Sequence, residues 1–174
     1  SKEEKLREAL KKVRKDVKDL ERHIDRSVKR NKEEVDKAKR ELERSLEELR
    51  RRLEELRRTE ELDRELKRLE EKNKEMLKRI DESLKESKKR NDKVKRELRE
   101  ELKRLEEEIR DAERKGLPVE ELLERLERTL RRMREKVRKL DKENKDHTEK
   151  VKEDVKRVHD ENDKVREDVD RKDK

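Results

Sequence analysis

Apolar residues fall at intervals of 4, 3, 4, 3 and 4 along nearly the whole chain. A walk with these steps from Leu6 to Leu56 visits fifteen positions, of which fourteen are apolar. Similar walks run from residue 62 to 112 and from 119 to 169, and the three together contain 37 of the 42 hydrophobic residues. Almost none remain for a second face, so each segment predicts an amphipathic helix with one narrow apolar seam.

The length of this repeat predicts the course of the helices. Five steps sum to 18 residues, which is five turns of an α-helix at about 3.6 residues per turn. A strict heptad repeat would impose a left-handed supercoil and an 11-residue repeat a right-handed one. An 18-residue repeat matches the relaxed helix, so we expect long, nearly straight helices.

Two interruptions separate the walks. In "ERKGLPVEELL", Gly116 suits a left-handed helix end and Pro118 the first turn of the next helix. Near residues 57–60, Thr59 is a candidate N-cap, and the seam shifts by two residues, which would move it to the opposite face of a continuous helix. We therefore predict helices over about residues 2–57, 60–114 and 118–172.

Short connections favour antiparallel neighbours. The predicted fold is all-α: residues 1–174 form a single-chain antiparallel three-helix bundle, up-down-up, of either hand. Charged residues make up 66% of the chain, but they are strong helix formers rather than the Pro, Gly and Ser of disordered segments. There is no cysteine, and no apolar run exceeds two residues. We expect a soluble protein without signal peptide or membrane span, cytoplasmic if produced recombinantly.

Polar residues interrupt the seams in a coordinated way. If the turns centre near residues 59 and 115–116, residue x of the first helix faces about 118 − x of the second, and residue y of the second faces about 231 − y of the third. Two layers then form. The first holds Ser27, Asn31, Ser87, Asn91, Asn144 and His147, with Asn31 opposite Ser87 and Ser87 opposite Asn144; the second holds Ser45, Asn73, His159 and Asn162.

An unpaired buried polar group costs about 1–3 kcal/mol, whereas a satisfied network fixes register. We interpret these residues as cross-helix hydrogen-bond networks. A loose seam whose polar side chains reach water, and a polar ligand pocket, remain the alternatives.

The 18-residue repeat, the layered Asn/Ser/His set and the Glu/Lys/Arg surface together resemble de novo designed helical bundles with buried hydrogen-bond networks. Initial "SKEE" and the "KGLP" loop fit the same style. The resemblance covers all three helices and is one of style. It implies a structural scaffold without a natural substrate, although the first connection lacks the glycine usual in designed loops.

No residue pattern predicts catalysis. His23, His147 and His159 lie too far apart along the bundle to share an ion, and a pair such as His159 with Asp163 would hold zinc weakly at best. Exposed carboxylates lack the environment that separates pKa values for acid–base work. We expect no enzyme activity, catalytic residue, cofactor, metal site or small-molecule substrate.

Partners are not required by this interpretation, and we expect a monomer. Residues 128–139 carry seven basic residues and one acidic one, near basic residues in 11–18 and 93–104. Without aromatic residues or a recognition motif, at most weak, nonspecific nucleic-acid binding is expected. The stronger alternative is an interaction module that self-associates or uses the valine-rich third helix as a displaceable latch. We favour a packing role for these valines, because small residues of one helix also face large residues of the others at the opposite end of the predicted bundle.

Overall fold

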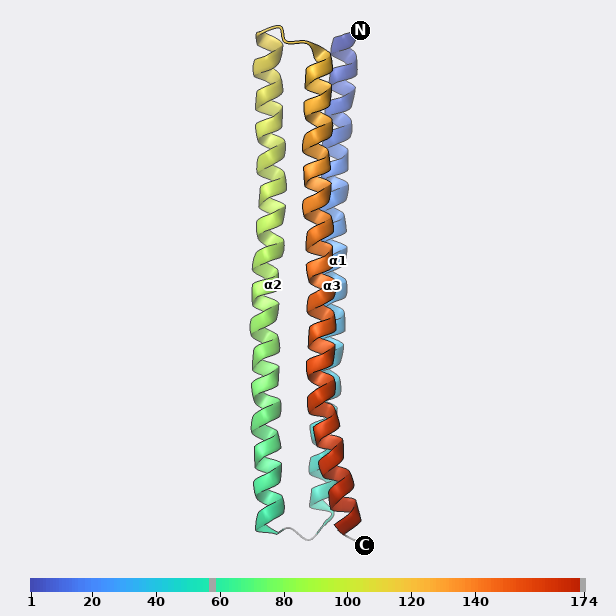
Figure 1. The fold of residues 1–174 in the computed structure, drawn as a ribbon, viewed down its shortest axis with the longest axis vertical. Helices are drawn as coiled ribbons and strands as arrows, with labels where there is room; N and C mark the ends of the chain where they lie inside the picture. Colours follow the sequence, from blue (N-terminus) through green and yellow to red (C-terminus); the bar gives the residue numbers. More distant parts are fainter. Residues whose placement is uncertain (57–58, 173–174) are drawn as a thin grey trace. The chain divides into compact units, whose positions relative to one another are not determined.

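The computed structural model describes residues 1–56 and 59–172, and all of its regular structure is helical (Figure 1). The chain forms α1 (Lys2–Glu54), α2 (Glu60–Arg114) and α3 (Val119–Lys172), each uninterrupted. The all-α three-helix bundle expected from the sequence is thus confirmed. α1 ends three residues before the predicted boundary, and residues 57–58 of the expected turn lie outside the described ranges.

Hydroxyl side chains cap the first two helices. The Ser1 Oγ accepts a hydrogen bond from the Glu4 amide at 3.3 Å, and the Thr59 Oγ1 accepts one from the Leu62 amide at 3.2 Å. Each bond satisfies one of the free N–H groups of a helix start. The prediction that Thr59 is an N-cap is confirmed.

Gly116 ends α2 in the left-handed conformation, with φ of 68°. Its N–H donates to the Glu113 carbonyl at 3.2 Å, while the N–H of Leu117 donates to the Ala112 carbonyl at 3.0 Å. These two bonds form a Schellman motif, which pairs carbonyls that the helix end leaves free. Pro118 immediately precedes α3 rather than lying in its first turn.

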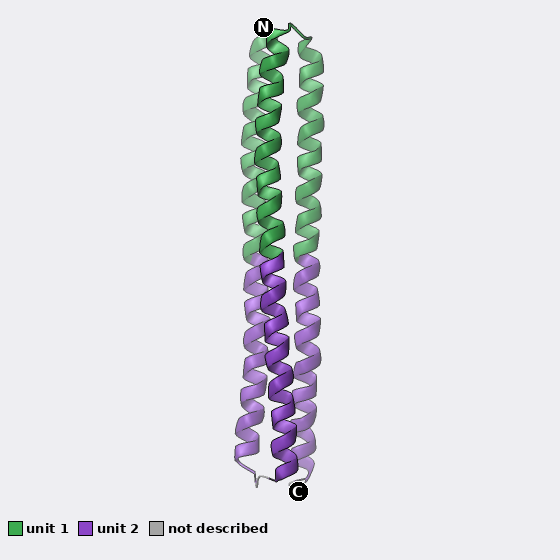
Figure 2. Cartoon of the chain, turned by 90° about the vertical axis from the view of Figure 1, so that its left-hand side faces the viewer, with its two compact units in different colours: residues 1–29, 87–144 green, residues 30–86, 145–174 purple. Residues whose placement is uncertain are grey.

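The chain divides into two compact units (Figure 2). Unit 1 comprises residues 1–29 and 87–144, and unit 2 comprises residues 30–86 and 145–174. Every helix contributes a segment to each unit, so each unit has a three-helix core of its own.

Ion pairs define the same topology within each unit. The residue numbers of α1–α2 partners add to 120, as in Glu21–Arg99 of unit 1 and Arg50–Glu70 of unit 2, so these helices are antiparallel. Partners between α1 and α3 differ by 118, so these helices are parallel. Such pairs are Lys2–Glu120, Asp16–Arg134 and His23–Asp141 in unit 1, and Glu34–Lys152, Glu48–Arg166 and Arg52–Asp170 in unit 2. The predicted up-down-up order holds in both units.

Each described residue of the predicted seams is buried or half-buried. Unit 1 contains one leucine-rich cluster, whereas unit 2 contains a valine-rich cluster around Val151, Val155 and Val158 and a separate one around Leu49 and Leu69. Four apolar residues outside the seams pack against these clusters: Ala9, Leu77, Leu123 and Leu130. Over the described residues, no helix combines the length and the apolar character that a membrane span requires.

Candidate functional site

Asn144 of α3 is the centre of a buried polar layer in unit 1. Its Nδ2 donates to the Ser27 Oγ at 3.0 Å and to the Asn91 Oδ1 at 3.1 Å, while its Oδ1 accepts from the Ser87 hydroxyl at 3.3 Å. All four side chains are 5% exposed or less. One amide therefore links all three helices inside the core, and we call this set the Asn144 layer.

A second layer, the Asn162 layer, lies in unit 2. Asn162 and Asn73 exchange two amide hydrogen bonds of 3.1 Å, and the Asn162 Nδ2 also donates to the Ser45 Oγ at 3.2 Å. The remaining proton of Asn73 Nδ2 is directed to the Leu69 carbonyl, at 2.7 Å. The reciprocal pair fixes α2 against α3, and the serine adds α1.

The two layers repeat one arrangement. Each contains a serine from α1, an asparagine from α2 and a donor asparagine from α3. Ser27 and Ser45 are 18 residues apart, as are Asn144 and Asn162, and Asn91 and Asn73 in the opposite direction. Eighteen residues are five whole helical turns, so the repeat returns each polar residue to the same face of its helix.

His147 forms a third set of bonds, within unit 2. The Ser83 hydroxyl donates to the Ile80 carbonyl at 2.7 Å, so its Oγ is free to accept from His147 Nε2, at 2.8 Å. In a row of hydrogen bonds such as this one, the position of the histidine proton is assigned from the donors and acceptors around the ring. With its proton on Nε2, His147 accepts at Nδ1 from the Asn31 Nδ2 at 3.0 Å, which also donates to the Thr148 Oγ1 at 2.7 Å. This His147 layer again joins α1, α2 and α3.

The partners differ from the predicted pairing by about one turn between α1 and α3. The loop centres placed Asn31 beside Ser87 and Asn144, but Asn144 instead bonds Ser27, and Asn31 bonds His147 and Thr148. The pairing of Ser27 with Asn91 and of Ser45 with Asn73 through α3 asparagines agrees with the expected layers. The predicted pairing of α1 with α3 depends on the assumed centres of both loops. An error of a few residues at each loop adds up to about one helical turn.

Ser83 of α2 and His159 of α3 both differ from the predicted network. Ser83 was not among the predicted network residues, because it precedes the seam position Leu84; its spacing of four residues from Ser87 is the signal that could have identified it. His159, expected in the second layer, lies instead at the surface, 39% exposed, with Nδ1 3.1 Å from the Asp163 carboxylate. It follows the seam residue Val158 and so points to one side of the core.

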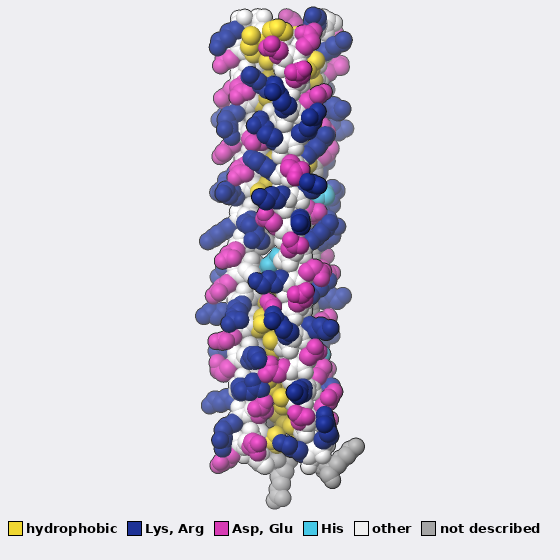
Figure 3. Space-filling model, viewed as in Figure 1, with side chains coloured by type: hydrophobic (Ala, Val, Ile, Leu, Met, Phe, Trp, Pro, Cys, Tyr) yellow, Lys and Arg dark blue, Asp and Glu magenta, His cyan; other side chains and the backbone are white. Residues whose placement is uncertain are grey.

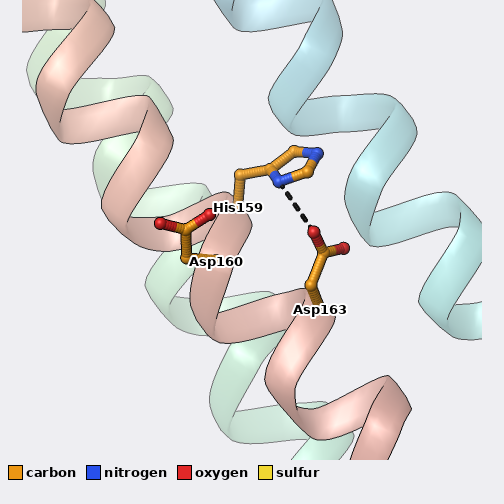
Figure 4. A group of neighbouring side chains, drawn as sticks. All are labelled: His159, Asp160 and Asp163. Atoms are coloured by element: carbon orange, nitrogen blue, oxygen red, sulfur yellow. Dashed lines mark ion pairs between the residues drawn. The ribbon is translucent and has the colours of Figure 1, made fainter.

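His159, Asp160 and Asp163 form the one group of three side chains with metal-binding chemistry in the described ranges (Figure 4). Their ligand atoms lie within 4.8 Å of one another. All three come from one turn of one helix, and the Arg166 guanidinium, 3.9 Å from Asp163, already supplies positive charge. The group amounts to a surface ion pair with a neighbouring carboxylate.

Charged side chains of both signs interleave along the face seen in Figure 3. Glu161 of unit 2 pairs with Lys72 and with Arg68, the latter at 2.9 Å. The hydrogen bond from Lys72, followed by that from Arg68, lowers the pKa of Glu161 below its ordinary value. The described residues contain one buried side-chain polar atom without a partner, the Glu101 Oε2.

Comparison with known proteins adds no relative. No protein-family model matches the chain, and neither curated proteins nor solved structures gave a match.

Proposed function

We propose that this chain is a designed structural scaffold without catalytic activity, whose buried polar layers hold three helices in one register. The observation that carries the proposal is the repeated Ser–Asn–Asn arrangement of the Asn144 and Asn162 layers. Apolar seams with an 18-residue repeat pack almost equally well after a slip, because leucine and valine contacts are non-directional. Hydrogen bonds between named amides are directional, and a slip would leave them unpaired at about 1–3 kcal/mol each.

Cross-linking can test this role in unit 2, because the chain has no cysteine of its own. The side chains of Glu34 and Lys152 meet at 2.9 Å, so Glu34→Cys with Lys152→Cys reports the native register. Glu34→Cys with Lys145→Cys reports a slip of seven residues, about 10 Å along α3. A short bis-maleimide reagent should join the first pair and leave the second unjoined.

Both pairs are then placed in a variant in which all three layers are apolar: Ser27→Ala, Asn31→Leu, Ser45→Ala, Asn73→Leu, Ser83→Ala, Ser87→Ala, Asn91→Leu, Asn144→Leu, His147→Leu and Asn162→Leu. We expect this variant to stay helical and to cross-link at both positions. Cross-linking at the native pair alone would show that loops and ion pairs set the register, and it would overturn the proposal.

A second candidate, α3 as a displaceable latch, is favoured by one observation. The cluster that α3 closes in unit 2 contains three valines from this helix, facing Val35, Ala38, Leu42 and Ile80. Such a cluster buries less apolar area than the leucine-rich cluster of unit 1. If added peptide 145–174 exchanges into the intact protein, measured as fluorescence transfer to a labelled α1, the latch gains support.

A further inference from the structure

The two units differ sharply in charge. Unit 1 contains 32 Lys and Arg against 23 Asp and Glu, a net charge of +9, whereas unit 2 contains 29 against 30, a net charge of −1. The chain's whole positive charge of +8 therefore arises from unit 1. Such asymmetry is typical of a surface that attracts polyanions.

Part of this excess forms a patch on the exposed side of α3, where residues 128–142 contain eight Lys and Arg against two Asp and Glu. Six exposed basic residues lie opposite the buried seam of this helix, which we call the α3 basic face: Arg128, Arg131, Arg132, Arg138, Lys139 and Lys142. One acidic residue, Glu135, lies among them, and it pairs with Arg138 at 2.7 Å. Among the described residues, no carboxylate lies within ion-pair distance of Arg128, Arg131, Arg132, Lys139 or Lys142.

Neighbouring basic residues extend this face toward α2. Glu97 of α2 contacts Lys136 of α3 at 3.4 Å, which identifies the side of α2 that borders α3. Lys93 and Arg104 precede and follow Glu97 by four and seven residues, so they lie on the same stripe of the helix. Both are exposed.

We propose that the α3 basic face of unit 1 binds the phosphate backbone of duplex DNA without sequence preference. Successive basic residues three or four apart rise about 4.5–6 Å along the helix, and arginine forks match phosphate oxygens well. Duplex DNA offers about one negative charge per 1.7 Å of its axis. Single strands are held largely by stacking on aromatic side chains, of which this chain has none.

The test measures fluorescence anisotropy of a labelled duplex with the full chain at two salt concentrations. If four phosphates are contacted, affinity should fall about 100-fold between about 50 and 200 mM NaCl. The variant Arg128→Gln, Arg131→Gln, Arg132→Gln, Lys139→Gln should bind at least about tenfold more weakly at the lower salt concentration and show a shallower salt slope. Glutamine is a comparable helix former, and circular dichroism checks that the fold survives.

A matched control removes the same charge from exposed residues of unit 2: Lys74→Gln, Lys78→Gln, Arg79→Gln and Lys85→Gln. It should bind DNA like the parent protein. Equal losses in both variants would show that net charge alone matters and would overturn the proposal. So would equal binding of single strands, or retention by heparin without binding to DNA at the lower salt concentration.

Discussion

At the scale of single residues, the amides of Asn144 and Asn162 each depend on partners from two other helices. Asn162 supplies both a donor pair and an acceptor, so no side chain of another shape can satisfy Ser45 and Asn73 together. The stabilisation belongs to the layer as a unit, and a buried group that loses its partner costs more than the bond contributed.

Asn162→Leu should therefore destabilise the protein by about 1–3 kcal/mol, because it removes the partner of the buried Ser45 hydroxyl and of the buried Asn73 Oδ1. The triple variant Ser45→Ala, Asn73→Leu, Asn162→Leu should regain most of that loss, since no polar group remains to be satisfied. Guanidinium unfolding followed by circular dichroism measures both. A triple variant less stable than Asn162→Leu would contradict the explanation that the loss comes from buried polar groups without hydrogen-bond partners.

Glu161 predicts a pH dependence. Its pKa is lowered in the folded protein by Lys72 and Arg68, so its ion pairs stabilise the fold above the ordinary glutamate pKa of about 4.3. That contribution is lost as pH falls through the lowered folded pKa, because the folded state must then take up the proton. The stability difference between the parent and Glu161→Gln should be present at neutral pH and shrink in acid. Glu135→Gln, which removes a more exposed pair, should show a smaller effect. A difference independent of pH would contradict this assignment.

At the scale of helices, the sequence predicts where a helix begins and ends more closely than which residues of two neighbouring helices face each other. The bounds of α2 and the capping roles of Thr59 and Gly116 follow from local chemistry, and these predictions were confirmed. The pairing of α1 with α3 depends on the geometry of both loops, so it could be placed only to within about one turn. His159 shows the same limit, because a residue beside a seam points to a side that periodicity does not decide.

Gly116→Ala tests the end of α2. An added Cβ would meet no atom within 4 Å, so the substitution strains the backbone, at φ of 68°, without a clash. We expect a loss of about 1–2 kcal/mol from the left-handed conformation alone. Gly116→Asn should lose less, because asparagine tolerates this conformation. Thermal or denaturant unfolding measures both, and an unchanged Gly116→Ala protein would argue against the strain.

The valine-rich cluster makes α3 of unit 2 a candidate for early opening. Amides near Val151, Val155 and Val158 should exchange with deuterium faster than those near Met133 and Leu140, because less apolar area holds the helix there. Exchange followed by mass spectrometry distinguishes the two segments. Slower exchange around the valines would remove the basis of the latch.

At the scale of the whole molecule, the polar layers already find partners within one chain. With Glu101 Oε2 as the one exception among the described side chains, no buried polar atom is left for a second copy to satisfy. Exposed large hydrophobic residues are also limited, in the described ranges, to Leu117. Both facts favour a monomer over an obligate oligomer.

Size-exclusion chromatography with light scattering at micromolar concentration should thus give the mass of one chain, 21.7 kDa. A doubled mass would indicate that helices exchange between copies. In that case, the same layers would have to be completed across chains.

The Asn162 layer has a consequence for how unit 2 can change. It lies between the valine-rich cluster and the cluster around Leu49 and Leu69, which do not merge into one core. The side chains of a polar layer are held by directional hydrogen bonds, so they do not shift to fill a void opened beside them, as leucine side chains partly do. The two apolar clusters can therefore be redesigned separately, each with its own set of apolar residues, while the amides between them keep the three helices in register.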